Sequence, residues 1–235
     1  MLLQISCFST FDKTVYSCDE IVAIARKCKN AGASTLHFHI EKVGDARDFL
    51  RVAQKLDEEK IGLSVSSQDF KKILLNSCVF PKSIKYVAMH ASDCKIFTTQ
   101  IKQTFCMAEQ QLQDYTKLGV IPEVHMFNQK GIENCLVLAE KYGYNFLPIV
   151  NMGYPCEMRI THELIEEIMN RLNKFSQIVF VLFDNDNPSY YNLILKHRKG
   201  IRIGLEDNGH CGTIRATNCV DCAKYISGLM EKASL

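Results

Sequence analysis

The stretch Gly200-Ile201-Arg202-Ile203-Gly204-Leu205-Glu206-Asp207-Asn208 decides how the rest of the chain is interpreted. Its aliphatic residues alternate with Arg202, Gly204 and Glu206, which is the period-two pattern of a strand with two different faces. The strand then runs into two adjacent carboxylates, and charged residues are seldom buried unless they are paired or bind a metal. We interpret this stretch as a buried strand that ends at the rim of an active site.

Strand-like and helix-like segments alternate along the whole chain. The expected strands are Leu2–Cys7, Ser34–Ile40, Gly62–Ser67, Tyr86–Ala91, Val120–Phe127, Phe146–Met152, Gln177–Phe183 and Ile201–Asp207. The expected helices are Ser17–Asn30, Asp45–Glu58, Asp69–Leu75, Thr98–Leu118, Lys130–Tyr142, Thr161–Asn173, Pro188–His197 and Ala216–Glu231. Eight such strand–helix units imply a parallel sheet and are the usual content of a (β/α)8 TIM barrel.

An open, doubly wound sheet is the alternative fold. It would place a glycine-rich phosphate turn directly after the first strand. The residues there, Cys7-Phe8-Ser9-Thr10-Phe11, contain no glycine. No linker or low-complexity segment interrupts the alternation, so we predict a single TIM-barrel domain over residues 1–235.

Composition excludes several classes of function. The 235 residues are 47% hydrophobic and 23% charged, as in an ordinary globular protein with a sizeable core. A net charge of +2 leaves no electrostatic footprint for nucleic acid or an anionic membrane. No stretch approaches the roughly 20 apolar residues of a membrane-spanning helix. We therefore expect neither nucleic acid nor a membrane as a partner.

Eleven cysteines are many for a chain of this length. Their odd number and the lack of a basic secretory leader favour reduced thiols in a cytoplasmic protein, most of them packing as small apolar residues. Cys219-Val220-Asp221-Cys222, with His210-Cys211 upstream, would fit a structural zinc site or a redox pair. The helical spacing of Cys219 and Cys222 favours packing instead.

In a barrel the chemistry lies at the carboxyl ends of the strands. The second expected strand ends in His37-Phe38-His39, whose two imidazoles share a face, and the eighth ends in Glu206. Two histidines and one carboxylate form the ligand set of catalytic zinc sites. The same set would suit ferrous iron in an oxygenase, so ligand types alone leave the metal open.

Three segments resemble the β-keto acid cleavage enzyme family, whose named member is 3-keto-5-aminohexanoate cleavage enzyme. They are the helix and strand up to His37-Phe38-His39, the run Pro122–Asn128, and Ile201–Asn208, which is close to the most specific signature of the family. The resemblance implies a TIM barrel with zinc held by His37, His39 and Glu206. It also implies a homo-oligomer that exchanges carbon units between a small β-keto acid and acetyl-CoA, giving acetoacetate and an acyl-CoA.

The resemblance further implies roles for four other residues. Asp207, paired with Arg202, acts as a base in substrate activation; Ser66 contacts the substrate; and Glu123 is the acid of the fifth strand. Zinc would polarise the keto group, which is Lewis-acid catalysis at a developing negative charge. An aspartate whose charge Arg202 neutralises stays ionised and can act as a base.

The chain also departs from the family pattern. Glu41 stands near a position where the family has an arginine, His125 and Asn128 replace two acids, and Ser67-Gln68 replace a threonine and a glycine. The metal ligands are therefore kept while substrate recognition is altered. Two other functions stay open: a metal hydrolase or lyase on the same barrel without coenzyme A, and a non-catalytic metal-binding descendant. The loop Gly209–Gly212 could hold a phosphate of coenzyme A, or use glycine only for its permissive φ.

Overall fold

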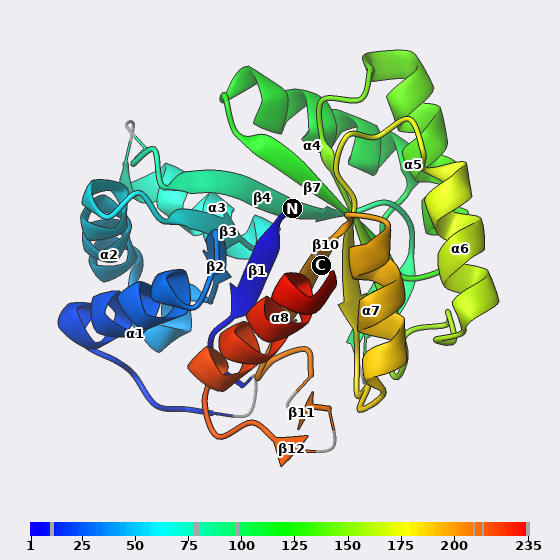
Figure 1. Ribbon diagram of the computed structural model, residues 1–235. Coiled ribbons are helices and arrows are strands. Elements are labelled where there is room, and N and C mark those ends of the chain that lie inside the picture. The colour runs from blue at the N-terminus through cyan, green and yellow to red at the C-terminus, as the bar shows by residue number, and fades with distance from the viewer. Residues whose placement is uncertain (10–11, 78–79, 97–98, 209, 213, 234–235) are drawn as a thin grey trace.

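The computed structural model describes residues 1–9, 12–77, 80–96, 99–208, 210–212 and 214–233. Eight parallel strands close into a barrel in the order β1-β10-β9-β8-β7-β4-β3-β2 (Figure 1). These strands are β1 (Leu3–Ser6), β2 (Thr35–His37), β3 (Gly62–Val65), β4 (Ile84–His90), β7 (Ile121–Met126), β8 (Leu147–Met152), β9 (Val179–Leu182) and β10 (Gly200–Gly204). Each lies within or overlaps an expected strand, and the predicted (β/α)8 barrel is confirmed.

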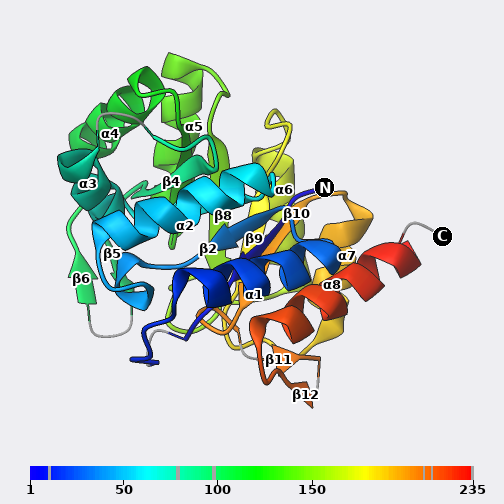
Figure 2. The same ribbon diagram turned by 90° about the vertical axis from the view of Figure 1, so that its left-hand side faces the viewer.

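Each barrel strand is followed by a helix, and the helices surround the barrel (Figures 1 and 2). They are α1 (Cys18–Asn30), α2 (Ala46–Glu58), α3 (Ser67–Asn76), α4 (Phe105–Lys117), α5 (Gln129–Tyr142), α6 (His162–Arg171), α7 (Pro188–Lys196) and α8 (Cys219–Ala233). The last helix packs against the first and last strands, which joins the two ends of the chain. Within the described ranges, no helix has both the length and the apolar character needed to cross a bilayer.

Capping residues set where the first helix begins. The amide of Glu20 donates to Ser17 Oγ at 3.3 Å, and the amide of Ser17 donates to Glu20 Oε2 at 2.7 Å. This reciprocal pair satisfies two of the amides that a helix start leaves without partners. The predicted start at Ser17 is therefore confirmed.

The helix expected over Thr98–Leu118 is wrong at its beginning. Residue 98 lies outside the described ranges, and β6 (Thr99–Ile101) pairs antiparallel with β5 (Cys94–Ile96). Helix α4 starts only at Phe105, because Thr104 Oγ1 accepts from the amide of Met107 at 3.3 Å. Threonine and isoleucine in this segment favour strand, and the cap defines the later start.

The last helix also begins later than the expected Ala216. Residues before it form β12 (Ile214–Arg215), which pairs antiparallel with β11 (His210–Cys211). Asn218 Oδ1 then accepts from the amides of Val220 at 3.0 Å and Asp221 at 3.1 Å, which caps the helix. Gly209, part of the loop considered for a phosphate, lies outside the described residues.

The two cysteines of the C-x-x-C motif belong to the core. Cys219 is 3% exposed and Cys222 is fully buried, and both join the main hydrophobic cluster between helices and strands. Ten described cysteines are free thiols. The packing interpretation of the motif therefore holds in the fold.

Both faces of the barrel strands are buried, because helices cover the outside and side chains fill the inside. Polar side chains enter the inside from β1, β2, β3, β7, β8 and β10, namely Gln4, Ser6, Thr35, His37, Ser64, Glu123, His125, Asn151 and Arg202. Apolar side chains from β8 and β9, which are Leu147, Ile149, Val179 and Val181, form a separate cluster there.

Candidate metal centre

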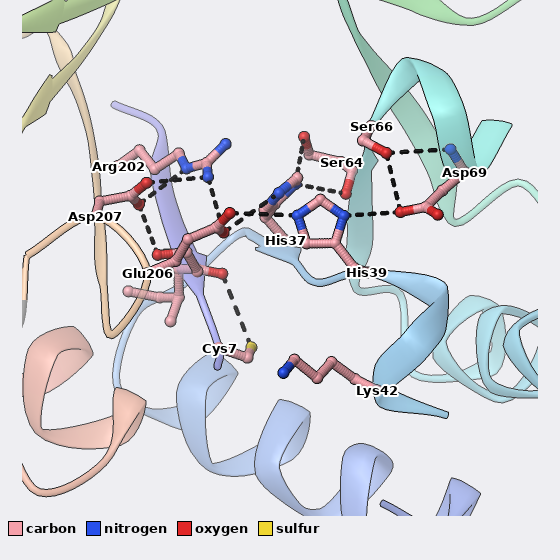
Figure 3. A network of polar contacts seen from close by, with 12 residues as sticks. Cys7, His37, His39, Lys42, Ser64, Ser66, Asp69, Arg202, Glu206 and Asp207 are labelled. Carbon is pink, nitrogen blue, oxygen red and sulfur yellow. Dashed lines mark hydrogen bonds and ion pairs between the residues drawn. The ribbon is translucent and has the colours of Figure 1, made fainter. Parts of the chain in front are cut away.

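Three sequence-predicted ligands meet at the carboxyl end of the barrel. One atom each from His37, His39 and Glu206 lies within 4.8 Å of the other two. Figure 3 shows the carboxylate of Glu206 between both imidazoles and Arg202. Across the part of the chain that the structure describes, no other group of three histidine, cysteine or acidic ligands comes this close together. The structure therefore brings together the ligand set that the sequence predicted.

The two histidines reach the site from one strand end. His37 is the last residue of β2, and His39 continues in extended backbone at φ −96° and ψ 154° before the short 3-10 helix at Ile40–Lys42. Residues two apart in extended backbone point to the same face. The two rings are accordingly 5.1 Å apart and nearly perpendicular.

Glu206 and Asp207 are placed by a turn and not by the strand alternation. Strand β10 ends at Gly204, earlier than the expected Asp207, and the amide of Asn208 donates back to the Gly204 carbonyl at 2.8 Å. A Cβ on Gly204 would lie 1.9 Å from the Ser6 carbonyl oxygen, so only glycine allows this approach. In continued strand the two carboxylates would face opposite sides; the turn directs both into the site.

Each histidine has a hydrogen-bond partner on the side of the ring that faces away from Glu206. His37 Nδ1 lies 3.0 Å from the Ser64 carbonyl oxygen, and His39 Nδ1 lies 2.8 Å from Asp69 Oδ2. The opposite nitrogens face Glu206, at 3.4 Å for His37 Nε2 and 3.2 Å for His39 Nε2. Partners of this kind fix the ring orientation and the tautomer of metal-binding histidines.

Asp69 is a site residue that the sequence reasoning missed. The amide of Asp69 donates to Ser66 Oγ at 3.1 Å, and Ser66 Oγ donates to Asp69 Oδ2 at 2.9 Å. The signal was available as a serine cap with an acid three residues later, at the start of α3. Ser66 lines the cavity, and it also caps α3 and orients Asp69, while its contact with substrate stays a prediction.

The pKa values of the two histidines are shifted in opposite directions. Burial, followed by the charge of Arg202, lowers the pKa of His37 to about 3. Burial also acts to lower the pKa of His39, but hydrogen bonds to Asp69 and Glu206 raise it to about 10. Burial acts to raise the pKa of Glu206, yet the two histidines hold it well below its usual value. The carboxylate of Glu206 is therefore ionised, as a metal ligand must be.

Arg202 and Asp207 form the predicted pair. The Arg202 guanidinium donates to Asp207 Oδ2 at 2.9 Å and to Oδ1 at 3.0 Å, and it also reaches Glu206 Oε2 at 3.2 Å. Ser6 Oγ donates to Asp207 Oδ2 at 2.6 Å. Burial raises the pKa of Asp207 above its usual value, although Arg202 acts to lower it. A raised pKa suits a carboxylate that must take up and return a proton.

Glu123 lies inside the barrel beneath the histidines. It is fully buried and accepts from Gln4 Nε2 and from Ser64 Oγ, both at 2.5 Å. Ser64 in turn contacts His37, so Glu123 reaches the metal ligands through Ser64. Glu123 does not line the cavity above, whereas the other predicted site residues do. Its catalytic role therefore stays a prediction.

A cavity of about 440 Å³ opens over the ligands. Its walls come from the barrel strands β2, β3, β4, β7, β8, β9 and β10, or the residues just after them, and from the β5–β6 pair. They are formed by His37, His39, Ser66, Ala88, His90, Ile96, Thr99, Ile101, His125, Phe127, Asn151, Phe183, Arg202, Glu206 and Asp207.

The departures from the family pattern fall in different places. Glu41 is 67% exposed and Asn128 caps α5 by accepting from the amide of Gly131 at 2.8 Å, and neither lines the cavity. His125 does line it. The change at His125 is therefore the one that bears directly on what the cavity binds.

Comparisons with known structures agree on the fold. ObcA in complex with oxaloacetate superposes with a TM-score of 0.65 at 13% identity, covering 93% of this chain and 63% of that one. Apo ObcA gives 0.69 at 13% identity, with 93% and 62% covered. A 3-keto-L-gulonate-6-phosphate decarboxylase from Vibrio cholerae gives 0.56 at 6% identity, with 99% and 96% covered. At these identities the likeness shows the fold alone, and the chain spans less than two thirds of ObcA.

Sequence comparison supplies the family. No curated protein matches the chain. The family model described as beta-keto acid cleavage enzyme matches residues 14–226, which include both histidines, Glu206 and the Arg202–Asp207 pair. The chain belongs to the beta-keto acid cleavage enzyme family.

Proposed function

We propose that this protein is a zinc-dependent enzyme that exchanges carbon units between a small β-keto acid and acetyl-CoA, giving acetoacetate and an acyl-CoA. Membership of the family supports an enzyme acting on β-keto acids. The observation that carries the metal dependence is the convergence of two imidazole nitrogens on the Glu206 carboxylate. The coenzyme and the reaction products rest on the family resemblance.

The donor set fits a metal cation. The Ser64 carbonyl oxygen can only accept, so His37 Nδ1 carries the ring proton and Nε2 presents a lone pair. That lone pair faces Glu206 Oε2, a second acceptor, at 3.4 Å. Two acceptors that face each other without a proton between them repel, and a cation bound between them removes the repulsion. The same carboxylate faces His39 on its other oxygen.

Zinc is the metal we propose, because two histidines and one carboxylate leave a coordination position open for substrate. When bound, zinc supplies Lewis-acid polarisation of the keto group and stabilises developing negative charge. The residues that would hold it are His37, His39 and Glu206. Asp69 and the Ser64 carbonyl would keep the two rings in place.

The residues beside the ligands handle the proton. Oδ2 of Asp207 accepts from both Ser6 and Arg202, whereas Oδ1 accepts from Arg202 alone among these contacts. Oδ1 is therefore the oxygen that takes the substrate proton. Arg202 neutralises the carboxylate before the transfer, and Ser6 fixes its orientation.

Metal content and turnover test this function together. We expect about one zinc per purified chain, lost in His37→Ala and kept in His197→Ala, the exposed histidine at the C-terminal end of α7, which is the matched control. Elemental analysis measures the metal. Acetoacetate formation from a panel of β-keto acids, with and without acetyl-CoA, measures the reaction.

The outcomes separate the proposal from its two alternatives. Acetoacetate that forms only with acetyl-CoA supports the proposal. Cleavage without acetyl-CoA would instead indicate a hydrolase or lyase on the same barrel. Bound metal without turnover of any substrate in the panel would indicate a non-catalytic binding protein.

A further inference from the structure

The charged groups in the cavity wall are already paired with one another. Glu206 faces the two histidines, and both oxygens of Asp207 accept from Arg202. Among the described lining residues there is no other carboxylate, lysine or arginine. A charged group on the far end of a bound substrate would therefore find no counter-ion.

The wall opposite the metal ligands is mostly apolar. Its apolar side chains are Ala88 on β4, Ile96 and Ile101 on the β5–β6 pair, Phe127 after β7 and Phe183 after β9, and its polar ones are uncharged amide, hydroxyl or imidazole groups (Asn151, Thr99, His90 and His125). Phe127 and Phe183 also belong to an apolar cluster inside the barrel. A buried methylene gains about fourfold in affinity on such a wall, whereas an unpaired charge loses far more than this.

His125 lines this part of the cavity, but its Nε2 atom does not open into it. The ring is about nine-tenths buried, and Nε2 has almost no accessible surface. The nearest charged atom to Nε2 is Glu123 Oε2, at 3.8 Å inside the barrel. A molecule in the cavity therefore contacts other atoms of the ring.

The contacts of Asn151 define what His125 offers. Asn151 Nδ2 lies 3.3 Å from His125 Nδ1, 3.3 Å from the Met126 carbonyl oxygen and 3.2 Å from the Ile149 carbonyl oxygen. Two carbonyl acceptors assign this atom as the amide nitrogen, which can only donate. Nδ1 of His125 therefore accepts, and the ring proton sits on Nε2. The Nε2–H of His125 therefore faces the Glu123 carboxylate and not the cavity.

We infer that the cavity takes a β-keto acid with an uncharged, apolar side chain. The inference rests on the proposed function, because the acid head is assigned to the metal side of the same cavity. The apolar side chains of the opposite wall then cover the side chain of the acid, and they determine specificity.

Calorimetric titration of the zinc-loaded protein tests the side-chain preference without requiring turnover. The probes are three 3-oxo acids of equal length that end in a methyl, a carboxylate or an ammonium group. We expect the methyl-ended acid to bind at least about tenfold more tightly than either charged one. Equal or tighter binding of a charged acid, or binding of none, would overturn the inference.

A matched pair of variants on the β5–β6 pair sharpens this test. Ile101→Asp places a carboxylate on the apolar wall, and Ile101→Asn places an uncharged group of the same size there. The Asp variant should bind the ammonium-ended acid about tenfold more tightly than the Asn variant does. Equal affinities of the two variants would show that the side chain does not lie against this wall.

Measurements of binding and of turnover distinguish a failure of this inference from a failure of the proposed function on which it rests. Preferred binding of the methyl-ended acid without any cleavage would remove the proposed reaction and leave the side-chain assignment standing. Cleavage that favours a charged acid would leave the reaction standing and overturn the inference.

Discussion

The two halves of the cavity have opposite chemistry. The metal half consists of His37, His39, Arg202, Glu206 and Asp207, on strand β2 and the turn after β10. The apolar half consists of Ala88, Ile96, Ile101, Phe127 and Phe183, on β4, the β5–β6 pair and the segments after β7 and β9.

This difference shows how one end of a barrel can hold the reacting groups in one half and the groups that select the substrate in the other. In the metal half every charge has two or more partners, so removal of one side chain leaves others buried and unpaired. In the apolar half contacts are non-directional, and a substitution changes fit by a modest amount. We therefore expect changes in the metal half to be large and changes in the apolar half to be small.

The largest effect is expected from Glu206→Ala. The carboxylate faces both histidines and Arg202, so its loss removes the group that holds the ligand set together. Bound metal should fall to less than about a tenth of the wild-type content, and turnover should be lost. Elemental analysis and the acetoacetate assay measure these. Retention of full metal content would show that the metal half is misassigned.

Asp207→Asn should separate chemistry from metal binding within the metal half. The amide keeps the size of the side chain but cannot act as a base, so turnover should fall by about 10²- to 10⁴-fold while the metal stays bound. Ser6→Ala, which removes only one hydrogen bond to Asp207, should cost much less. Normal turnover in Asp207→Asn would exclude the role assigned to Oδ1.

Gly204→Ala should show how strongly the turn of the metal half depends on glycine. The new Cβ would lie 1.9 Å from a backbone oxygen of β1, so the free energy of unfolding should fall by about 3–5 kcal/mol. Gly228→Ala is the matched control, because a Cβ there meets open space inside a helix and should stabilise by about 0.5–1 kcal/mol. Chemical denaturation measures both. Similar values for the two variants would contradict the close approach.

Asp69→Asn tests how much the hydrogen bond between Asp69 and His39 contributes to metal affinity. The hydrogen bond to His39 Nδ1 becomes weaker, and metal affinity should fall by about 10- to 100-fold without loss of the fold. Lys72→Ala is the control, since its exposed ammonium lies 3.5 Å from the other oxygen of Asp69 and faces away from the ring. Competition with a chelator measures the affinities. Equal loss in both variants would point to the general charge of this region as the cause.

Phe183→Leu should give the smallest effect and completes the contrast between halves. It removes part of the apolar wall, so KM for a methyl-ended β-keto acid should rise about two- to tenfold with metal content unchanged. Steady-state kinetics and elemental analysis measure the two quantities. A loss of metal in this variant would mean that the halves are not independent.

Local sequence patterns predicted most of the barrel and part of the site. Alternation of strands and helices gave the fold class, and the spacing of His37 and His39 placed both on one face because extended backbone repeats every two residues. The pattern failed at Thr98–Leu118, where β-branched residues form β6 ahead of the cap at Thr104. It also failed after Gly204, where the expected strand Ile201–Asp207 gives way to a turn that carries both carboxylates.

The sequence by itself determined the barrel, the His37–His39 pair and the presence of two acids after the last strand, because these depend on neighbours within a few residues. The tertiary structure decided that Asp69 contacts His39, that Glu123 accepts from Ser64, and that His125 Nε2 faces Glu123. It alone assembled the apolar wall from segments that are far apart in the chain. Such contacts depend on the closure of the barrel, which brings together strand ends that no local pattern relates.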